Sequence, residues 1–325
     1  MNLMKRFKSN WARGAAVAVL LALVLTPLVF DLGDYILTVV TLFLIYIILS
    51  QSWNLMGGYA GQVNLGLAAY FGVGAFCYNL LYSVGTPFWI AMLLGGLAAT
   101  ALSCVIGPPT LRLREAYFGI GTLAVAEVLA LIMNILYPQV RYAPPSYWAI
   151  FSLRKAYFIS LIATVLTMVT AYGVVSSRLG LILQAIRDDE DAANSSGINP
   201  AKYKMRVFFI SSFLAGIAGG VFGFYRGVLA PAQQFNASWT IGPLMAATIG
   251  GWGTLMGPVW GSLVYVILQE ILGRYVREAH FIITGIIFIL VIMFMPNGLA
   301  QAGVEVRRAL KSAVPRSRTP VQGGR

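Results

Sequence analysis

Long runs of apolar residues recur along this chain, and they constrain its fold more than any other feature. Hydrophobic residues make up 58% of the 325 residues and charged residues only 10%, whereas soluble domains contain roughly 45–50% and about 25%. An apolar run of about 17–25 residues can cross a bilayer as a helix, because a helix satisfies its backbone hydrogen bonds within the segment. The sequence therefore predicts an all-α integral membrane protein, a bundle of about ten transmembrane helices, some of them short or broken. The expected spans are Ala15–Phe30, Tyr35–Ser50, Val63–Tyr82, Pro87–Ile106, Tyr117–Tyr137, Ala156–Val175, Val207–Val228, Pro258–Leu272, Phe281–Met295 and the shorter Ala237–Gly250.

The net charge of +12 does not point to nucleic acid, because the basic residues cluster at the ends of the apolar runs. Most of the 23 Lys and Arg residues precede the first run, follow the fourth, lie between the sixth and seventh or end the chain. The positive-inside rule then favours ten crossings with both termini in the cytoplasm. We expect a cytoplasmic segment at residues 1–14, a transmembrane domain at residues 15–300 with a cytoplasmic loop at 178–206, and a cytoplasmic, disordered tail at 301–325.

Two glycine-rich stretches interrupt the apolar runs. Glycine permits backbone angles that other residues avoid, so a broken helix or a re-entrant turn is expected at the first stretch. Interrupted helices in corresponding positions of two halves are typical of internally repeated transporters. The glycines to which we assign this structural role are Gly57, Gly58 and Gly61 in the first stretch and Gly250, Gly251, Gly253 and Gly257 in the second.

Polar side chains within or beside the expected spans are candidates for a translocation path. They are costly to expose to lipid and should face protein or a water-filled path. The alternative is that they form hydrogen bonds between helices without any role in transport. The candidates are Asn54, Tyr59, Gln62, Asn64 and Glu127.

The chain offers little from which to build a catalytic or metal site. Its single histidine, His280, has no Cys, Asp or Glu cluster around it in sequence, and Cys77 and Cys104 both fall within apolar runs. The phosphate-binding pattern GxxxxGK[ST] is absent, so any ATP that drives this protein would be bound by another subunit. We expect no enzyme activity, no cofactor and no metal.

A polar island, residues 178–206, separates the sixth and seventh apolar runs. Asp188 is expected to cap a short helix that Gly197 ends in the left-handed conformation, and Asn199-Pro200 is expected to start the next helix. An amphipathic helix should come first, because apolar residues follow the i, i+3, i+4, i+7 spacing at Leu179, Ile182, Leu183 and Ile186.

The middle of the island has the composition of a docking surface. Ala192 and Ala193 are small enough to let a helix sit close in a groove of a partner. Nearby charges can set the register of such a contact, namely Arg187, Asp188, Asp189 and Glu190. The alternative is a solvated loop without a partner.

The island also carries a family resemblance. Asp191-Ala192-Ala193-x-x-x-Gly197 resembles the EAA loop of ATP-binding-cassette importer permeases, with Asp in place of the usual Glu. Other motifs, in order between about Ser50 and Leu299, are similar to those of branched-chain amino acid permeases. They are Gly58-Tyr59-Ala60-Gly61-Gln62, Leu111-Arg112-Leu113-Arg114, Ala185-Ile186-Arg187, Gly250-Gly251-x-Gly253-Thr254 and Pro296-x-Gly298-Leu299.

The resemblance implies a permease subunit with a type II ABC importer-like fold in the bacterial inner membrane. Its implied partners are a second homologous permease, two cytoplasmic ATPases, a periplasmic substrate-binding protein and membrane lipid. The helix around residues 188–196 would be the coupling helix that docks on an ATPase. The residues to which the resemblance assigns this coupling are Arg187, Asp188, Glu190, Asp191, Ala192, Ala193 and Gly197.

The sequence departs from the family pattern at two positions. Leu67 stands where the family often has His, and Asn64 replaces a common Ser. The expected cargo is a branched-chain or related amino acid, and urea, amides and aromatic acids are alternatives within the family. A secondary carrier is the competing transport mechanism, and a membrane-embedded enzyme is a third possibility with little chemistry to support it.

Overall fold

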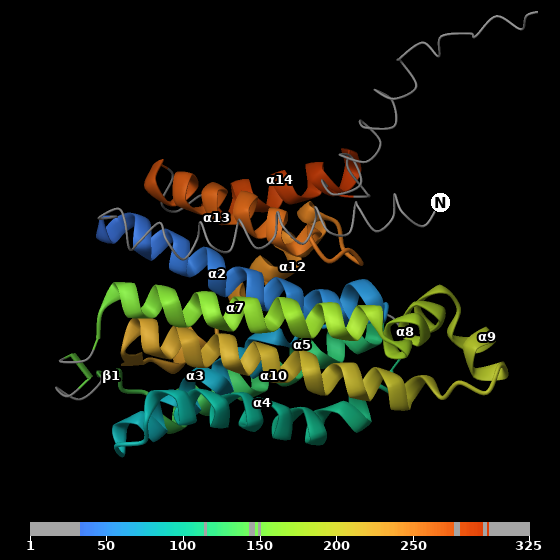
Figure 1. Ribbon diagram of the computed structural model, residues 1–325, viewed down its shortest axis with the longest axis horizontal. Helices are drawn as coiled ribbons and strands as arrows, with labels where there is room; N and C mark the ends of the chain where they lie inside the picture. Colours follow the sequence, from blue (N-terminus) through green and yellow to red (C-terminus); the bar gives the residue numbers. More distant parts are fainter. Residues whose placement is uncertain are drawn as a thin grey trace, which may run out of the picture.

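The computed structural model describes residues 33–113, 116–142, 147–148, 151–275, 280–294 and 298. Its long helices lie side by side in a bundle (Figure 1). The expected span Ala15–Phe30, the N-terminal segment and the C-terminal tail lie outside the described residues. In chain order the elements are α2 (Asp34–Asn54), the π-helix η1 (Leu55–Tyr59), α3 (Leu67–Ser83), α4 (Phe88–Thr110), α5 (Ala116–Leu136), β1 (Arg141–Tyr142), α7 (Leu153–Ser176), α8 (Arg178–Asp188), α9 (Glu190–Ser195), α10 (Pro200–Arg226), β2 (Val228–Leu229), α11 (Pro231–Gln234), α12 (Ser238–Gly250), α13 (Gly257–Tyr275) and α14 (His280–Phe294).

Each expected span after the first corresponds to one helix, which confirms the helical bundle. Five helices are long and apolar enough to cross a membrane by length and composition: α2 with η1, α4, α5, α7 and α10. Among the described residues, the only strands are β1 and β2, which pair antiparallel over two residues each. The bundle is therefore essentially all-α.

Two helices begin at other residues than the apolar runs suggest. α10 begins at Pro200 rather than Val207, because the Asn199 side chain caps it by accepting a 3.1 Å hydrogen bond from the Lys202 N–H. α3 begins only at Leu67 rather than Val63. The preceding residues stay non-helical, and the Asn64 Oδ1 accepts a 2.8 Å hydrogen bond from the Gly66 N–H.

α10 lies at the centre of the bundle, whereas α5 lies at its edge. In the most apolar window of α10, 78% of the residues are buried, against 17% in that of α5. Glycine brings α10 and α3 into backbone contact, since a Cβ on Gly74 would overlap Gly216 and a Cβ on Gly219 would overlap the Phe71 carbonyl. Small residues allow helices in a membrane to approach this closely.

Hydroxyl groups join the helices inside the bundle. The Ser52 Oγ donates a 2.6 Å hydrogen bond to the Ser211 carbonyl, and the Ser211 Oγ donates a 2.9 Å hydrogen bond to the Ser52 carbonyl. The hydroxyls of Ser50 and Ser262 lie 2.8 Å apart and connect α2 to α13. These buried contacts hold three helices together without an ionisable group.

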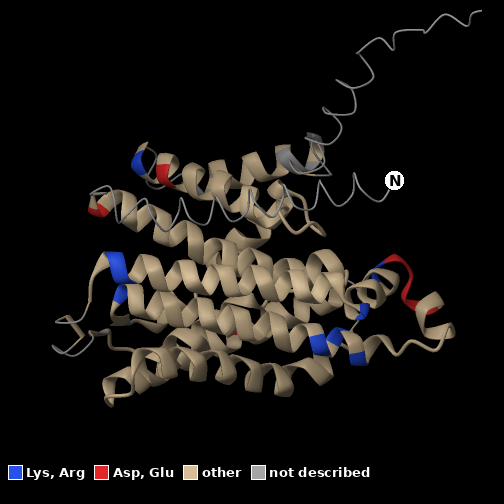
Figure 2. Ribbon diagram, viewed as in Figure 1, with Lys and Arg blue, Asp and Glu red and all other residues tan. Residues whose placement is uncertain are grey.

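Apart from Glu127 in α5, the charged residues of the described helices gather at the two ends of the bundle (Figure 2). One end carries α8 and α9. At the other end, the Tyr35 hydroxyl at the start of α2 donates a 2.6 Å hydrogen bond to the Glu270 carboxylate near the end of α13. This distribution suits a multi-pass membrane protein. The cytoplasmic location of the island end stays a prediction.

Candidate functional site: the polar island and two glycine-rich stretches

The polar island folds into two short helices that extend from one end of the bundle (Figure 1). α8 begins after Ser177, whose hydroxyl accepts a 3.2 Å hydrogen bond from the Leu179 N–H. The expected apolar face turns toward the bundle, because Leu183 and Ile186 are buried and Leu179 and Ile182 are half-buried. The predicted amphipathic helix is confirmed.

The short helix α9 is capped by Asp189, and the expectation that Asp188 caps it is wrong. The Asp189 Oδ1 accepts a 2.9 Å hydrogen bond from the Ala192 N–H. Asp188 stays in the last turn of α8, where its carboxylate lies 3.3 Å from the Arg187 Nη2. Both aspartates fit the capping pattern, and only the residue at which α8 ends decides between them.

The end of α9 follows the predicted pattern. Gly197 has a φ of +84°, and the Ile198 N–H donates a 3.1 Å hydrogen bond to the Ala193 carbonyl, as in a left-handed helix terminus. Ala193 is buried against its own chain, whereas Ala192 and Gly197 are exposed. The outward surface of α9 therefore contains Ala192 and Gly197 but not Ala193.

An ion pair fixes α9 to α10. The Lys204 Nζ lies 2.7 Å from the Glu190 Oε2, and the Lys204 side chain is only 3% exposed. A buried ammonium is costly unless a counter-charge pairs with it. The sequence assigned Glu190 to a partner contact and gave Lys204 no role, since nothing local in the sequence signals their pairing.

The first glycine-rich stretch breaks the helix, as expected. α2 widens into the π-helix η1, and no helix forms from Ala60 to Gly66. The Trp53 indole lies against Gly57, where a Cβ would come within 2.5 Å of the ring. Gly61 has a φ of +71°, which other residues rarely adopt.

The second glycine-rich stretch turns the chain between α12 and α13. Gly251 and Gly253 have φ angles of +105° and +71°. A Cβ on Gly250 would overlap the Gly257 carbonyl, and a Cβ on Gly257 would overlap the Gly251 carbonyl. Side chains at these positions would separate α12 from α13.

The two stretches lie in direct contact, and we call residues 57–61 with residues 250–254 the glycine junction. Asn54 joins them, because its Oδ1 accepts a 2.7 Å hydrogen bond from the Gly253 N–H and its Nδ2 donates a 2.9 Å hydrogen bond to the Thr254 carbonyl. The rings of Trp53 and Trp252 stack beside this contact, with centroids 6.2 Å apart and planes 4° apart. The two glycine-rich stretches thus form one structural unit.

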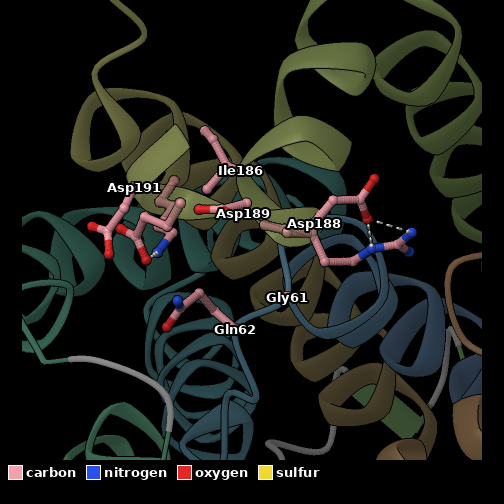
Figure 3. Close-up of a pocket in the computed structure, with 10 residues that line it drawn as sticks. Gly61, Gln62, Ile186, Asp188, Asp189 and Asp191 are labelled. Atoms are coloured by element: carbon pink, nitrogen blue, oxygen red, sulfur yellow. Dashed lines mark hydrogen bonds and ion pairs between the residues drawn. The ribbon is translucent and has the colours of Figure 1, made fainter. Parts of the chain in front are cut away.

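A cavity of about 310 Å³ opens between the island and the glycine junction (Figure 3). Figure 3 shows Asp188 and Asp191 pointing away from each other, with Gln62 on the bundle side. The cavity is lined by Ala60, Gly61, Gln62, Ile186, Arg187, Asp188, Asp189, Glu190, Asp191 and Lys204. Most of the residues expected to couple to an ATPase therefore surround one cavity.

Four of the five path candidates lie inside the bundle near the glycine junction. Asn54, Tyr59, Gln62 and Asn64 are all buried. Among the described residues, the Gln62 Oε1 and the Asn64 Nδ2 have no hydrogen-bond partner. Tyr59 belongs to η1, whereas Asn54 precedes it and Gln62 and Asn64 follow it in the chain.

Glu127 is the exception among the path candidates. It is exposed, and it lies near the middle of α5 on the face opposite the buried Thr122 and Ala126. The same face exposes Ile120, Leu131 and other apolar residues. A carboxylate at the centre of a membrane span costs about 2.5–3.5 kcal/mol in insertion experiments, so this face is an unusual one to turn toward lipid.

Comparison with known proteins agrees with this architecture. The sequence pattern of the family described as "Branched-chain amino acid transport system / permease component" matches residues 35–292. The chain is 27% identical to the high-affinity branched-chain amino acid transport system permease protein LivM of Escherichia coli (strain K12), over 87% of this chain and 73% of that protein.

Two further relatives bear on cargo and assembly. The chain is 24% identical to the nucleoside ABC transporter permease protein NupC of Lactococcus lactis, over 71% of this chain and 83% of that protein. It is 30% identical to the branched-chain amino acid permease protein LivH of Escherichia coli (strain K12), over 38% of this chain and 40% of that protein. No solved structure matches the fold.

Proposed function

Because the chain belongs to the family of branched-chain amino acid transport system permease components, we propose that it is the membrane subunit of an ATP-driven importer for branched-chain or related amino acids. The match over residues 35–292 carries this conclusion, since it covers nearly all of the bundle. The family is one of transport permeases and not of enzymes. Two cytoplasmic ATPases would supply the energy, and a periplasmic binding protein would deliver the cargo.

The island supports the proposal that the ATPases dock here. α9 is held at both of its ends, by the Asp189 cap and by the left-handed Gly197, and the Glu190–Lys204 ion pair braces it from the side. A helix so short is marginal by itself, so these contacts are what give it a defined position. Asp188, Asp191, Ala192 and Gly197 then offer a rigid, exposed surface to an ATPase.

The exposed face of α5 supports the proposal that a second permease completes the path. Glu127 faces outward from a single copy of the chain, so a partner or a water-filled path must cover it in a membrane. LivH and LivM of Escherichia coli are both named permease proteins of branched-chain amino acid transport, and this chain is similar to each. The partner would be a second permease of this kind.

The cargo is proposed as a class only. The similarity to LivM favours branched-chain amino acids as the cargo. The similarity to NupC adds nucleosides to the alternatives of urea, amides and aromatic acids. A binding protein that delivers the cargo would set much of the specificity. Ligand binding to that protein, measured by calorimetry with each class in turn, would identify the cargo.

The experiment that tests the transport mechanism is reconstitution into vesicles. The chain together with its partner permease, ATPases and binding protein should accumulate labelled leucine only when ATP is present on the ATPase side. Accumulation by the chain alone under an ion gradient would overturn this proposal in favour of a secondary carrier. Glycine-rich interruptions like the two that meet at the glycine junction are also typical of secondary transporters. The experiment therefore includes that alternative.

The proposed topology places both termini and the island in the cytoplasm of a bacterial cell, with the bundle in the inner membrane. Residues 1–14, 15–300 and 301–325 would be the N-terminal segment, the transmembrane domain and the tail. A membrane-impermeant thiol reagent should label a cysteine at Ser196 only in inside-out vesicles. Labelling of that cysteine in intact spheroplasts would reverse the orientation.

A further inference from the structure

Arg187 lies where the island meets both glycine-rich stretches, and its partly exposed side chain reaches toward the bundle. Its Nη1 donates a 2.9 Å hydrogen bond to the carbonyl of Gly58, 129 residues earlier in the chain. Gly58 lies in the last turn of the broken helix, where backbone carbonyls lack partners within the helix. Arg187 therefore caps the carboxyl end of the helix formed by α2 and η1, and its positive charge suits that end.

Two glycines make room for the Arg187 side chain. A Cβ on Gly61 would lie 2.8 Å from the Arg187 Cγ, and a Cβ on Gly253 would lie 2.9 Å from the Arg187 Nη1. The aliphatic part of the Arg187 side chain thus passes over the first glycine-rich stretch, and its guanidinium lies against the second. A side chain at either position would displace Arg187. Both positions therefore need glycine for space as well as for their positive φ angles.

Asn54 ties the two stretches of the glycine junction together. It holds Gly253 and Thr254 against the end of α2 with two partly buried hydrogen bonds. A shift of the Gly58 carbonyl would therefore move the turn that precedes α13 as well. Asp188 lies 3.3 Å from the Arg187 Nη2 on the outer side and orients the guanidinium toward the bundle.

A second, separate contact anchors the island to α10. The Glu190–Lys204 ion pair belongs to α9 and α10 and does not include the glycine junction. Besides the apolar packing of Leu183 and Ile186, two polar contacts of different chemistry thus attach the island to the bundle, an ion pair to α10 and a charge-assisted hydrogen bond to the helix formed by α2 and η1. Only the second attachment depends on Arg187.

We propose that Arg187 is a positioning residue that locks the island to the glycine junction, so that any displacement of α8 moves the ends of α2 and α13 together. This inference rests on the proposed ATP-driven function, because the displacement would come from a docked ATPase. It assigns Arg187 to the inside of the joint and leaves Asp191, Ala192 and Gly197 as its outer, partner-facing part. Removal of Arg187 would leave docking intact and disconnect the docked helix from the broken helices.

The first measurement is the distance between spin labels on a cysteine-free full-length chain in lipid nanodiscs. Labels at the exposed Leu181 and Met256 report α8 against the turn before α13, and labels at Leu181 and Lys202 report α8 against α10. Arg187→Ala should broaden the first distance distribution and leave the second narrow. Arg178→Ala, an exposed arginine on the same helix, is the matched control and should change neither.

The second measurement is cargo imported per ATP hydrolysed in the reconstituted complex. Arg187→Ala should bind the ATPases normally and lose roughly tenfold in this ratio, within the usual range of coupling between sites. Arg187→Lys keeps the positive charge but lacks the planar guanidinium, so its import per ATP hydrolysed should fall less. Arg187→Lys also serves as the test variant if Arg187→Ala does not fold.

The outcomes separate this inference from the proposed function. A narrow Leu181–Met256 distance in Arg187→Ala overturns the locking role, and a broadened distance with an unchanged import ratio overturns its part in transport. If the wild-type complex shows no ATP-driven import, the proposed function fails. The distance measurement on the chain alone then still decides whether Arg187 locks the joint.

Discussion

The backbone N–H of Gly253 donates a 2.7 Å hydrogen bond to the Asn54 side chain, which lies 199 residues earlier in the chain. The same side chain donates a 2.9 Å hydrogen bond to the Thr254 carbonyl. Asn54 is fully buried, whereas Gly253 and Thr254 are half-buried. One amide group thus holds together two stretches of chain that glycine has freed from regular helix.

Asn54→Ala should lower the free energy of unfolding by about 1–3 kcal/mol, because the partly buried Gly253 N–H and Thr254 carbonyl would lose their side-chain partner. Thermal unfolding of the purified chain in detergent measures the change. Asn134→Ala is the matched control, since the Asn134 side chain bonds only to Ala130 of its own helix. Equal losses in both variants would contradict the role of Asn54.

The Glu190–Lys204 pair predicts a non-additive pair of substitutions. Glu190→Gln leaves the buried Lys204 ammonium without its counter-charge and should cost about 1–3 kcal/mol, less than a fully buried pair because Glu190 is partly exposed. Glu190→Gln combined with Lys204→Met removes both charges and should be the more stable of the two variants. Chemical unfolding of the single and double variants tests this order, and a double variant that is less stable than Glu190→Gln would refute it.

Gly219→Ala should separate α10 from α3, because its Cβ would overlap the Phe71 carbonyl. Overpacking of this kind costs about 1–3 kcal/mol. Gly273→Ala is the control, since a Cβ there meets nothing within 4 Å and alanine favours the helix. The melting temperature should fall in the first variant and stay level or rise in the second.

Glu127→Leu should have opposite effects on the chain alone and on the assembled transporter. The isolated chain in lipid should gain stability, because a carboxylate no longer faces the bilayer. Import by the assembled complex should fall, because the partner or path that covers Glu127 loses its polar contact. Leu131→Ala on the same exposed face is the control, and an unchanged import rate in Glu127→Leu would remove Glu127 from the path.

Ala192→Trp should block docking of an ATPase without disturbing the chain itself, because Ala192 is exposed on α9. Pull-down of the ATPase by the purified permease measures docking. Ala192→Ser, which adds a single oxygen atom, should bind normally. Full binding by the tryptophan variant would place the ATPase contact elsewhere on the island.

The bundle could be predicted from the sequence because each span is a local property of the chain. An apolar run long enough for a bilayer forms a helix whatever its neighbours are, and α4, α5 and α7 begin and end within a few residues of their runs. The caps at Gly197 and Asn199 could be predicted for the same reason, since each depends on its own residue type.

The contacts of the site could not be predicted in the same way. Arg187 and Gly58 are far apart in the sequence, and nothing in either local pattern indicates that one side chain bonds to the other's carbonyl. The sequence interpreted Arg187 as part of a docking surface and gave Lys204 no role of its own. Their pairing inside the chain follows from how the helices pack, which a single sequence does not display.

The reciprocal hydrogen bonds between Ser52 and Ser211 divide the helix formed by α2 and η1 into arms of unequal length. At about 1.5 Å per residue, Ser52 lies about 10 Å from Tyr59 and about 27 Å from Asp34. These bonds fix how far α2 can slide along α10, and the Ser50–Ser262 contact holds α2 to α13 near the same level. If α2 tilted about this level, its Asp34 end would move about two and a half times as far as its Tyr59 end, so in the proposed transporter the helix would enlarge a small displacement of the island.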